Sequence, residues 1–193
     1  ADFNDAAPDL SKVDQERYKW LEYYKIKFNG DWYTSLYKRL VLRTNMQFGF
    51  LGAYNSDRGV IPFERFFLGG DGLGSFSLDG REAISLRGYP NQSLSSVNGG
   101  TIYNKFSLEL RHPITFKQAA TIYALAFMEA GNSYDKFSNY NPFNLYRSAG
   151  AGIRIFMPAF GLLGIDLGYG FDKLDGQSRR NGWETHFILG RQF

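Results

Sequence analysis

Apolar and polar residues alternate along the last segment of the chain, residues 182–193. Because successive side chains of a β-strand point to opposite faces, this pattern predicts a strand with one apolar and one polar face. The apolar face would carry Trp183, Thr185, Phe187, Leu189 and Phe193, and the polar face Glu184, His186 and Gln192.

The same alternation recurs upstream and predicts about seven strands in all. The two clearest are 23–36 and 40–50, which a short turn at residues 37–39 separates. The strand that begins at Ile102 is expected to end at His112-Pro113, because proline has no N–H to donate to a ladder. The remaining strands are predicted at 121–131, 145–156 and 163–171. The period of two therefore predicts an all-β, antiparallel protein.

Ionisable residues fall consistently on one face of these strands, although a soluble sandwich or barrel would also alternate. A Lys or Arg facing lipid at the bilayer midplane would cost about 2–4 kcal/mol. Short turns near residues 38, 115 and 158 alternate with longer loops near 70, 140 and 176, as in outer-membrane barrels. This asymmetry and the terminal Phe193 favour a transmembrane β-barrel with lipid outside. The ionisable residues are Lys25, Lys27, Asp31, Arg43, Lys105, Glu109, Arg111, Glu129, Arg154, Asp166 and Glu184.

The strand count bears on how much of a barrel this chain contains. Bacterial barrels have an even number of strands, from eight upward, whereas about seven are predicted here. Two unpaired strand edges in lipid would leave backbone polar groups unsatisfied, which is prohibitive. We therefore expect residues 1–193 to form the C-terminal part of a larger barrel.

Composition argues against most other classes of protein. Mean hydropathy is −0.34, and no run approaches the ~20 apolar residues of a membrane-spanning helix. The net charge of +3 is scattered, without the basic stripe of a nucleic-acid site. Cysteine is absent, His112 and His186 belong to no ligand-spaced cluster, and no Ser-His-Asp arrangement or phosphate loop occurs. We expect no enzymatic activity, metal or cofactor, and a flexible loop is favoured over a calcium site at Asp71 and Asp79.

A long glycine-rich segment, 54–98, contains Leu86-Arg87-Gly88-Tyr89 after the aromatic, double-glycine stretch 62–70. Together these resemble the loop-six signature of the BamA family, the insertases of the outer membrane. The resemblance implies about seven strands of a 16-stranded barrel, with 54–98 as an external loop folded into the lumen. Further segments similar to the strands that follow this loop in the family are 107–113, 125–131, 148–163 and 187–193.

The motif suggests a specific ion-pair site. Arginine presents a rigid planar fork that suits carboxylates, and glycine permits the tight turn of a loop tip. The resemblance implies that Arg87 pairs with Glu109 and Glu129, which point inward on the next two strands; Glu129 stands where the family usually has Asp. From spacing alone, a solvated Arg87 is an equally good interpretation, since exposed pairs contribute only ~0–1 kcal/mol.

The terminal strand is the second candidate site. In relatives it meets the first barrel strand at a loose seam, the lateral gate, where free backbone groups can pair with an incoming strand. The resemblance places Phe187, Gly190 and Phe193 at this seam. The alternative is that Gly190 only relieves crowding at the barrel rim.

The resemblance implies the central subunit of the outer-membrane assembly machinery, which folds and inserts β-barrel proteins without ATP or covalent chemistry. Its expected partners are outer-membrane lipids, unfolded outer-membrane proteins as clients, and accessory lipoproteins of an assembly complex. Two alternatives stay open: a translocation pore of the same superfamily, of the two-partner secretion type, and an ordinary porin-like channel.

Overall fold

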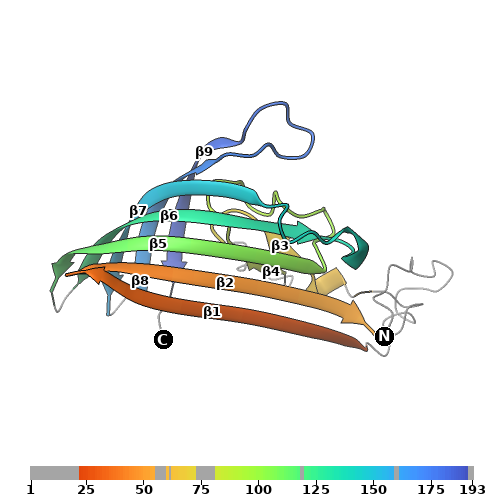
Figure 1. The fold of residues 1–193 in the computed structure, drawn as a ribbon, viewed down its shortest axis with the longest axis horizontal. Coiled ribbons are helices and arrows are strands. Elements are labelled where there is room, and N and C mark those ends of the chain that lie inside the picture. The colour runs from red at the N-terminus through yellow and green to blue at the C-terminus, as the bar shows by residue number, and fades with distance from the viewer. Residues whose placement is uncertain are drawn as a thin grey trace.

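The computed structural model describes residues 22–54, 60, 62–72, 81–117, 120–158 and 161–190. Seven long strands form one antiparallel sheet in the order β1-β2-β5-β6-β7-β8-β9 (Figure 1). No helix among these residues has the length and hydrophobicity needed to cross a membrane. The strands are β1 Tyr23–Tyr37, β2 Leu40–Ala53, β5 Ile102–Phe116, β6 Thr121–Tyr134, β7 Tyr146–Met157, β8 Gly161–Gly170 and β9 Gly182–Gly190.

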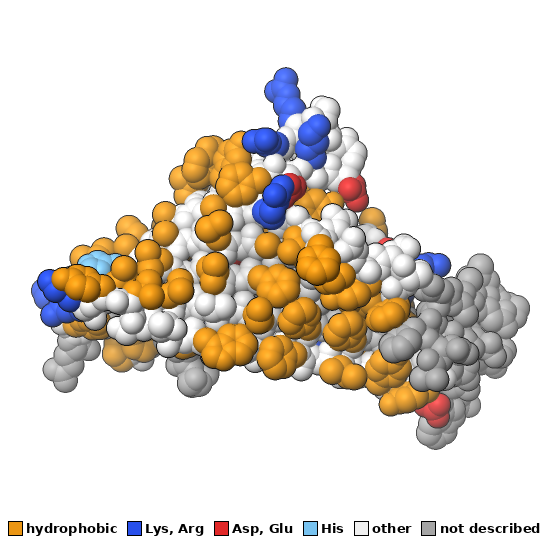
Figure 2. Space-filling model, viewed as in Figure 1, with side chains coloured by type: hydrophobic (Ala, Val, Ile, Leu, Met, Phe, Trp, Pro, Cys, Tyr) orange, Lys and Arg blue, Asp and Glu red, His pale blue; other side chains and the backbone are white. Residues whose placement is uncertain are grey.

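The two faces of the sheet have opposite chemistry. Phe28, Leu167 and Phe187, on β1, β8 and β9, are 51%, 47% and 56% exposed. On the opposite face, Glu109 and Asp166 are 4% and 0% exposed. Apolar side chains are spread widely over the face of the molecule that Figure 2 shows. A water-soluble barrel would have the reverse arrangement, so the faces predicted from the alternation are confirmed.

One predicted strand end is wrong. β5 does not stop at His112-Pro113 but continues to Phe116. Its pairing with β2 reaches only to Arg111, so in the described structure Pro113 has β6 alone beside it and removes no donor from a central ladder. The register with β6 also shifts between Pro113 and Thr115, an irregularity of the kind where proline is tolerated.

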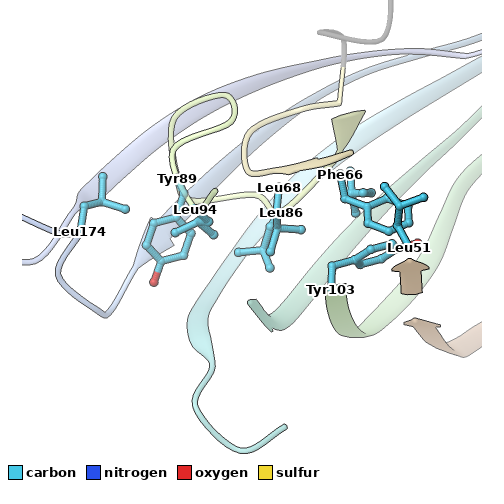
Figure 3. Close-up of a cluster of buried hydrophobic side chains, with 9 residues drawn as sticks. Leu51, Phe66, Leu68, Leu86, Tyr89, Leu94, Tyr103 and Leu174 are labelled. Carbon is cyan, nitrogen blue, oxygen red and sulfur yellow. The ribbon is translucent and has the colours of Figure 1, made fainter. Parts of the chain in front are cut away.

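The segment between β2 and β5 packs on the charged face of the sheet. It contains a 3-10 turn, η1 (Pro62–Glu64), and two parallel three-residue strands, β3 (Phe66–Leu68) and β4 (Glu82–Ile84), which the sequence did not predict. A second 3-10 turn, η3 (Phe137–Asn139), lies between β6 and β7. A buried apolar cluster joins the segment to the sheet (Figure 3); its members are Leu51, Phe66, Leu68, Ile84, Leu86, Tyr89, Leu94, Tyr103 and Leu174.

Candidate functional site

The double glycine and the Leu86–Tyr89 motif lie directly side by side. Gly70 N–H donates to the Leu86 carbonyl at 3.1 Å, and Leu86 N–H donates to the Gly70 carbonyl at 3.0 Å. Gly69 and Gly70 have φ values of 124° and 80°, a region that strains other residues. A side chain at Gly70 would also overlap Asn91. The two stretches that carry the sequence resemblance therefore form one unit.

Arg87 is 3% exposed and binds carboxylates from three strands. Its Nη2 donates to Glu109 on β5 at 2.7 Å and to Glu129 on β6 at 2.6 Å, and its Nη1 donates to Asp166 on β8 at 2.9 Å. The backbone N–H of Arg87 donates to the second oxygen of Glu129 at 2.8 Å. The guanidinium carbon lies 3.8 Å from the centre of the Phe127 ring, a favourable cation–π contact. Because one side chain contacts β5, β6 and β8 at once, the sheet curves around the motif, which lies on the concave face.

Further cations compensate the carboxylates that bind Arg87. A buried charge is strongly unfavourable unless it is paired and hydrogen-bonded. Each of the three carboxylates has a second cationic partner, so the network holds the guanidinium in one position. The additional pairs are Arg154–Asp166 at 2.5 Å, Lys105–Glu129 at 3.3 Å and Arg111–Glu109 at 2.5 Å.

Gly88 forms the turn at the tip of the motif. Its φ is +88°, and a Cβ there would lie 2.8 Å from the Ser148 side chain and 3.1 Å from the Gly170 backbone nitrogen. Gly168 and Gly170 on the inner face of β8 provide the space for this turn. A Cβ on Gly168 would lie 2.7 Å from the Gly88 nitrogen, and one on Gly170 would lie 2.4 Å from the Gly88 carbonyl. Two glycines of β8 thus form the surface on which the turn rests.

Two side chains hold the backbone of Gly88. The Gly88 N–H donates to Nε2 of His186 on β9 at 2.8 Å, and Nδ2 of Asn181 donates to the Gly88 carbonyl at 2.9 Å. His186 is 4% exposed on the inner face. Its Nε2 accepts this hydrogen bond, so a neutral imidazole carries its proton on Nδ1. The motif is therefore connected directly to the terminal described strand.

Tyr89 connects the motif to the ends of β7 and β8. The ring is fully buried, its hydroxyl donates to the Arg147 carbonyl at 2.7 Å, and the Asp172 N–H donates to the hydroxyl at 3.2 Å. Burial raises the pKa of Tyr89 to about 12, which disfavours ionisation of this hydroxyl further.

We expect Tyr89→Phe to destabilise this connection by about 1–2 kcal/mol, because two backbone groups lose a buried hydrogen-bond partner. Amide hydrogen exchange in residues 171–181 should become faster. Tyr54→Phe is the matched control, since the Tyr54 side chain is 70% exposed. Unchanged exchange in the Tyr89 variant would contradict the role of the hydroxyl.

The β8–β9 connection should loosen in acid. Hydrogen bonds from the side chain and backbone of Arg147 lower the pKa of Asp172 below its ordinary value of 3.8. A depressed pKa stabilises the folded state above the unfolded-state pKa, and this contribution is lost as pH falls through the folded-state pKa. Exchange protection of residues 172–181 should therefore fall between about pH 5 and pH 2. Arg147→Gln should remove most of this pH dependence; equal pH dependence in both proteins would contradict the assignment.

The three residues predicted to lie at a seam have different positions. Phe187 is exposed on the outer face, Gly190 pairs with Leu162 of β8, and Phe193 lies outside the described residues. In the described part of the chain, β9 has β8 as its one neighbour. Counted over the described residues, β9 has nine residues and β8 ten, against 14 or 15 in β1, β2, β5 and β6.

The structure brings Arg87 together with Glu109 and Glu129, and it adds Asp166 and His186. Sequence reasoning placed both of these on the inner face but gave them no role, because they lie 79 and 98 residues from their partners in the motif. The inward-facing glycines of β8 could have indicated this site, because a glycine inside a strand often marks a place where another backbone approaches closely. Where the structure describes the chain, no three His, Asp or Glu side chains are grouped to hold a metal ion.

The sequence of residues 13–193 matches the Omp85 superfamily domain. The chain therefore belongs to the Omp85 superfamily, whose β-barrel members reside in the bacterial outer membrane and are insertases or transporters, not enzymes. No curated protein sequence matches it.

The fold is similar to the crystal structure of BamA from Haemophilus ducreyi lacking POTRA domains 1–3. The TM-score is 0.61 at 18% sequence identity, over 86% of this chain and 35% of that one. The seven-stranded sheet thus matches part of the BamA barrel, and this chain spans about a third of that structure's length.

Proposed function

We propose that this protein is the central subunit of an outer-membrane assembly machinery, and that it folds and inserts β-barrel proteins through a lateral seam at β9. The observation that carries the proposal is the attachment of the motif to the edge strand. Gly88 N–H donates to His186 of β9, while Arg87 binds β5, β6 and β8. The motif thereby contacts β9 through an inward-facing side chain and not through the hydrogen-bonding edge of the strand.

The edge of β9 has the chemistry to accept an incoming strand. Among the described residues no strand lies beside β9 on the side away from β8, so its backbone N–H and C=O groups there can pair with another strand. Main-chain hydrogen bonds do not depend on the side chains of the partner. Such an edge suits a machine that accepts many different clients. Bare backbone groups are strongly disfavoured in hydrocarbon, so this edge requires either another strand of the barrel or a client strand.

The loop that contains the Leu86–Tyr89 motif also helps to choose between the insertase, a porin-like channel and a secretion pore. The buried cluster and the Arg87 network occupy the concave face from β2 to β9, which disfavours an open porin-like channel. A secretion pore of the same superfamily would instead move an unfolded chain past the loop. We propose unfolded outer-membrane proteins as the clients and accessory lipoproteins as further subunits, and the identity of the client separates the two functions.

Photo-cross-linking tests the seam. A photoactivatable phenylalanine analogue replaces Phe187 on β9 or, as the matched control, Ile153 on β7; both side chains face outward and are 56% and 52% exposed. In cells that produce a stalled β-barrel precursor, we expect a cross-linked product at position 187 and none at 153. Equal products at both positions would contradict the seam. A secreted passenger cross-linked from the inner face, at Gln47, would favour the secretion pore.

A further inference from the structure

The outer face of the sheet contains a hollow near the start of β7, where the β6–β7 connection ends. Strand register places Met46, Phe106, Ala130 and Arg147 next to one another across β2, β5, β6 and β7. The small side chain of Ala130 leaves space between its larger neighbours. The hollow has a volume of about 720 Å³, within the ~300–1,000 Å³ of typical small-molecule sites. Its apolar lining is completed by Leu108, Met128 and Phe171.

The rim of this hollow is positively charged. Arg147 is the second residue of β7 and faces outward beside Ala130, and its side chain is 65% exposed. Asp172 pairs with Arg147 at 2.7 Å and neutralises one charge. Arg180 also lines the hollow and is exposed, so the rim keeps an excess positive charge. Figure 2 shows basic side chains gathered above the apolar face, over the β8–β9 connection.

Arg147 and Arg180 share the single carboxylate of Asp172 at this lipid-facing rim, so a second anion would balance the remaining charge. An arginine that faces lipid near the bilayer interface is only slightly unfavourable, but nothing in the lipid tails stabilises it. A guanidinium group binds phosphate well, because it can donate two parallel hydrogen bonds. A lipid has two parts that match the two parts of the hollow. Its acyl chain fits the apolar lining, and its charged headgroup fits the rim. The charge and the apolar lining therefore complement a phosphate-bearing lipid.

We propose that this hollow binds one anionic lipid of the outer membrane. A phosphate of the headgroup lies between Arg147 and Arg180, and an acyl chain lies against Phe106, Ala130 and Met128. The site lies at the ends of the strands that carry the longer connections, which in outer-membrane barrels are external, so the lipid belongs to the outer leaflet. This site is separate from the β9 seam, and the proposal does not depend on the insertase function.

Native mass spectrometry of the protein purified from outer membranes in a mild detergent tests the site. Phosphatidylglycerol and phosphatidylcholine with identical acyl chains are added in equal amounts. We expect preferential retention of one phosphatidylglycerol. Arg180→Ala should reduce this retention about fivefold, the factor that corresponds to about 1 kcal/mol per basic residue near an anionic headgroup. Arg179→Ala, a neighbouring exposed arginine outside the lining, is the matched control.

A second variant tests the apolar part independently of the charge. Ala130→Leu fills the hollow and should reduce retention of both lipids, while heat-modifiable gel mobility shows that the barrel remains folded. Equal retention of the two lipids by the unaltered protein would overturn the proposal. Equal losses in the Arg179 and Arg180 variants, or a protein subunit instead of lipid cross-linked from position 128, would also overturn it.

Discussion

Arg87→Ala is expected to destabilise the protein by about 3–5 kcal/mol, the typical cost of removing one partner from a buried ion-pair network. The substitution leaves Glu109, Glu129 and Asp166 clustered on the inner face without the guanidinium that lies between them. The total stability of a typical domain is only about 5–15 kcal/mol, so a loss of this size should impair folding. Heat-modifiable gel mobility should be lost, and depletion of the unaltered protein should not be rescued by the variant.

Arg87→Lys distinguishes charge from geometry. Lysine keeps the positive charge but presents a point charge that cannot donate to three carboxylates in fixed directions. We expect it to restore little of the lost stability. A variant with Ala or Lys at position 87 that retained normal mobility and supported growth would contradict the role assigned to this network.

Gly88→Ala is expected to be the second most damaging single change. The left-handed backbone conformation costs an alanine about 1–2 kcal/mol. Contact of the new methyl group with Ser148 and the β8 backbone adds about 1–3 kcal/mol, because the backbone beneath Gly88 cannot move without shifting β8. The expected result is a loss of stability in urea unfolding and a loosened motif that no longer donates to His186.

Gly176→Ala is the matched control for this substitution. Gly176 has a φ of +79°, close to that of Gly88, but nothing lies within 4 Å of a Cβ built there. Gly176→Ala should therefore lower the free energy of unfolding only by the cost of the left-handed backbone conformation, about 1–2 kcal/mol. Equal destabilisation by the two substitutions would show that contact with β8 contributes nothing.

The strands were predictable because membrane strands carry a period of two that local sequence reveals. β1 and β2, from Tyr23 to Ala53, have an apolar outer row and a polar inner row, and their predicted positions agree with the structure to within a few residues. The end of β5 was not predictable. Whether Pro113 breaks a ladder depends on how far the neighbouring strand β2 extends, and that is a property of the pairing and not of the residues around the proline.

Only the part of the site formed by the Leu86–Tyr89 motif and the next two long strands was predictable from the sequence. Arg87, Glu109 and Glu129 lie within 42 residues of one another in sequence. Asp166 and His186 enter the site because the sheet curves until β8 and β9 face the motif, and no local pattern reports the curvature. The parallel pair β3 and β4 was missed because three-residue strands are too short to show a period.

The orientation of the two faces can be measured directly with nitroxide side chains at the adjacent positions Phe28 and Asn29 of β1, in protein reconstituted into lipid vesicles. Phe28 lies on the exposed apolar face, and Asn29 pairs with Gln47 on the polar face. Relaxation by dissolved oxygen, which concentrates in hydrocarbon, should be strong at position 28, and relaxation by a water-soluble nickel chelate should be stronger at 29. The reverse result would place the apolar face in the protein interior and contradict the assignment of the Arg87 site to the inside of an outer-membrane barrel.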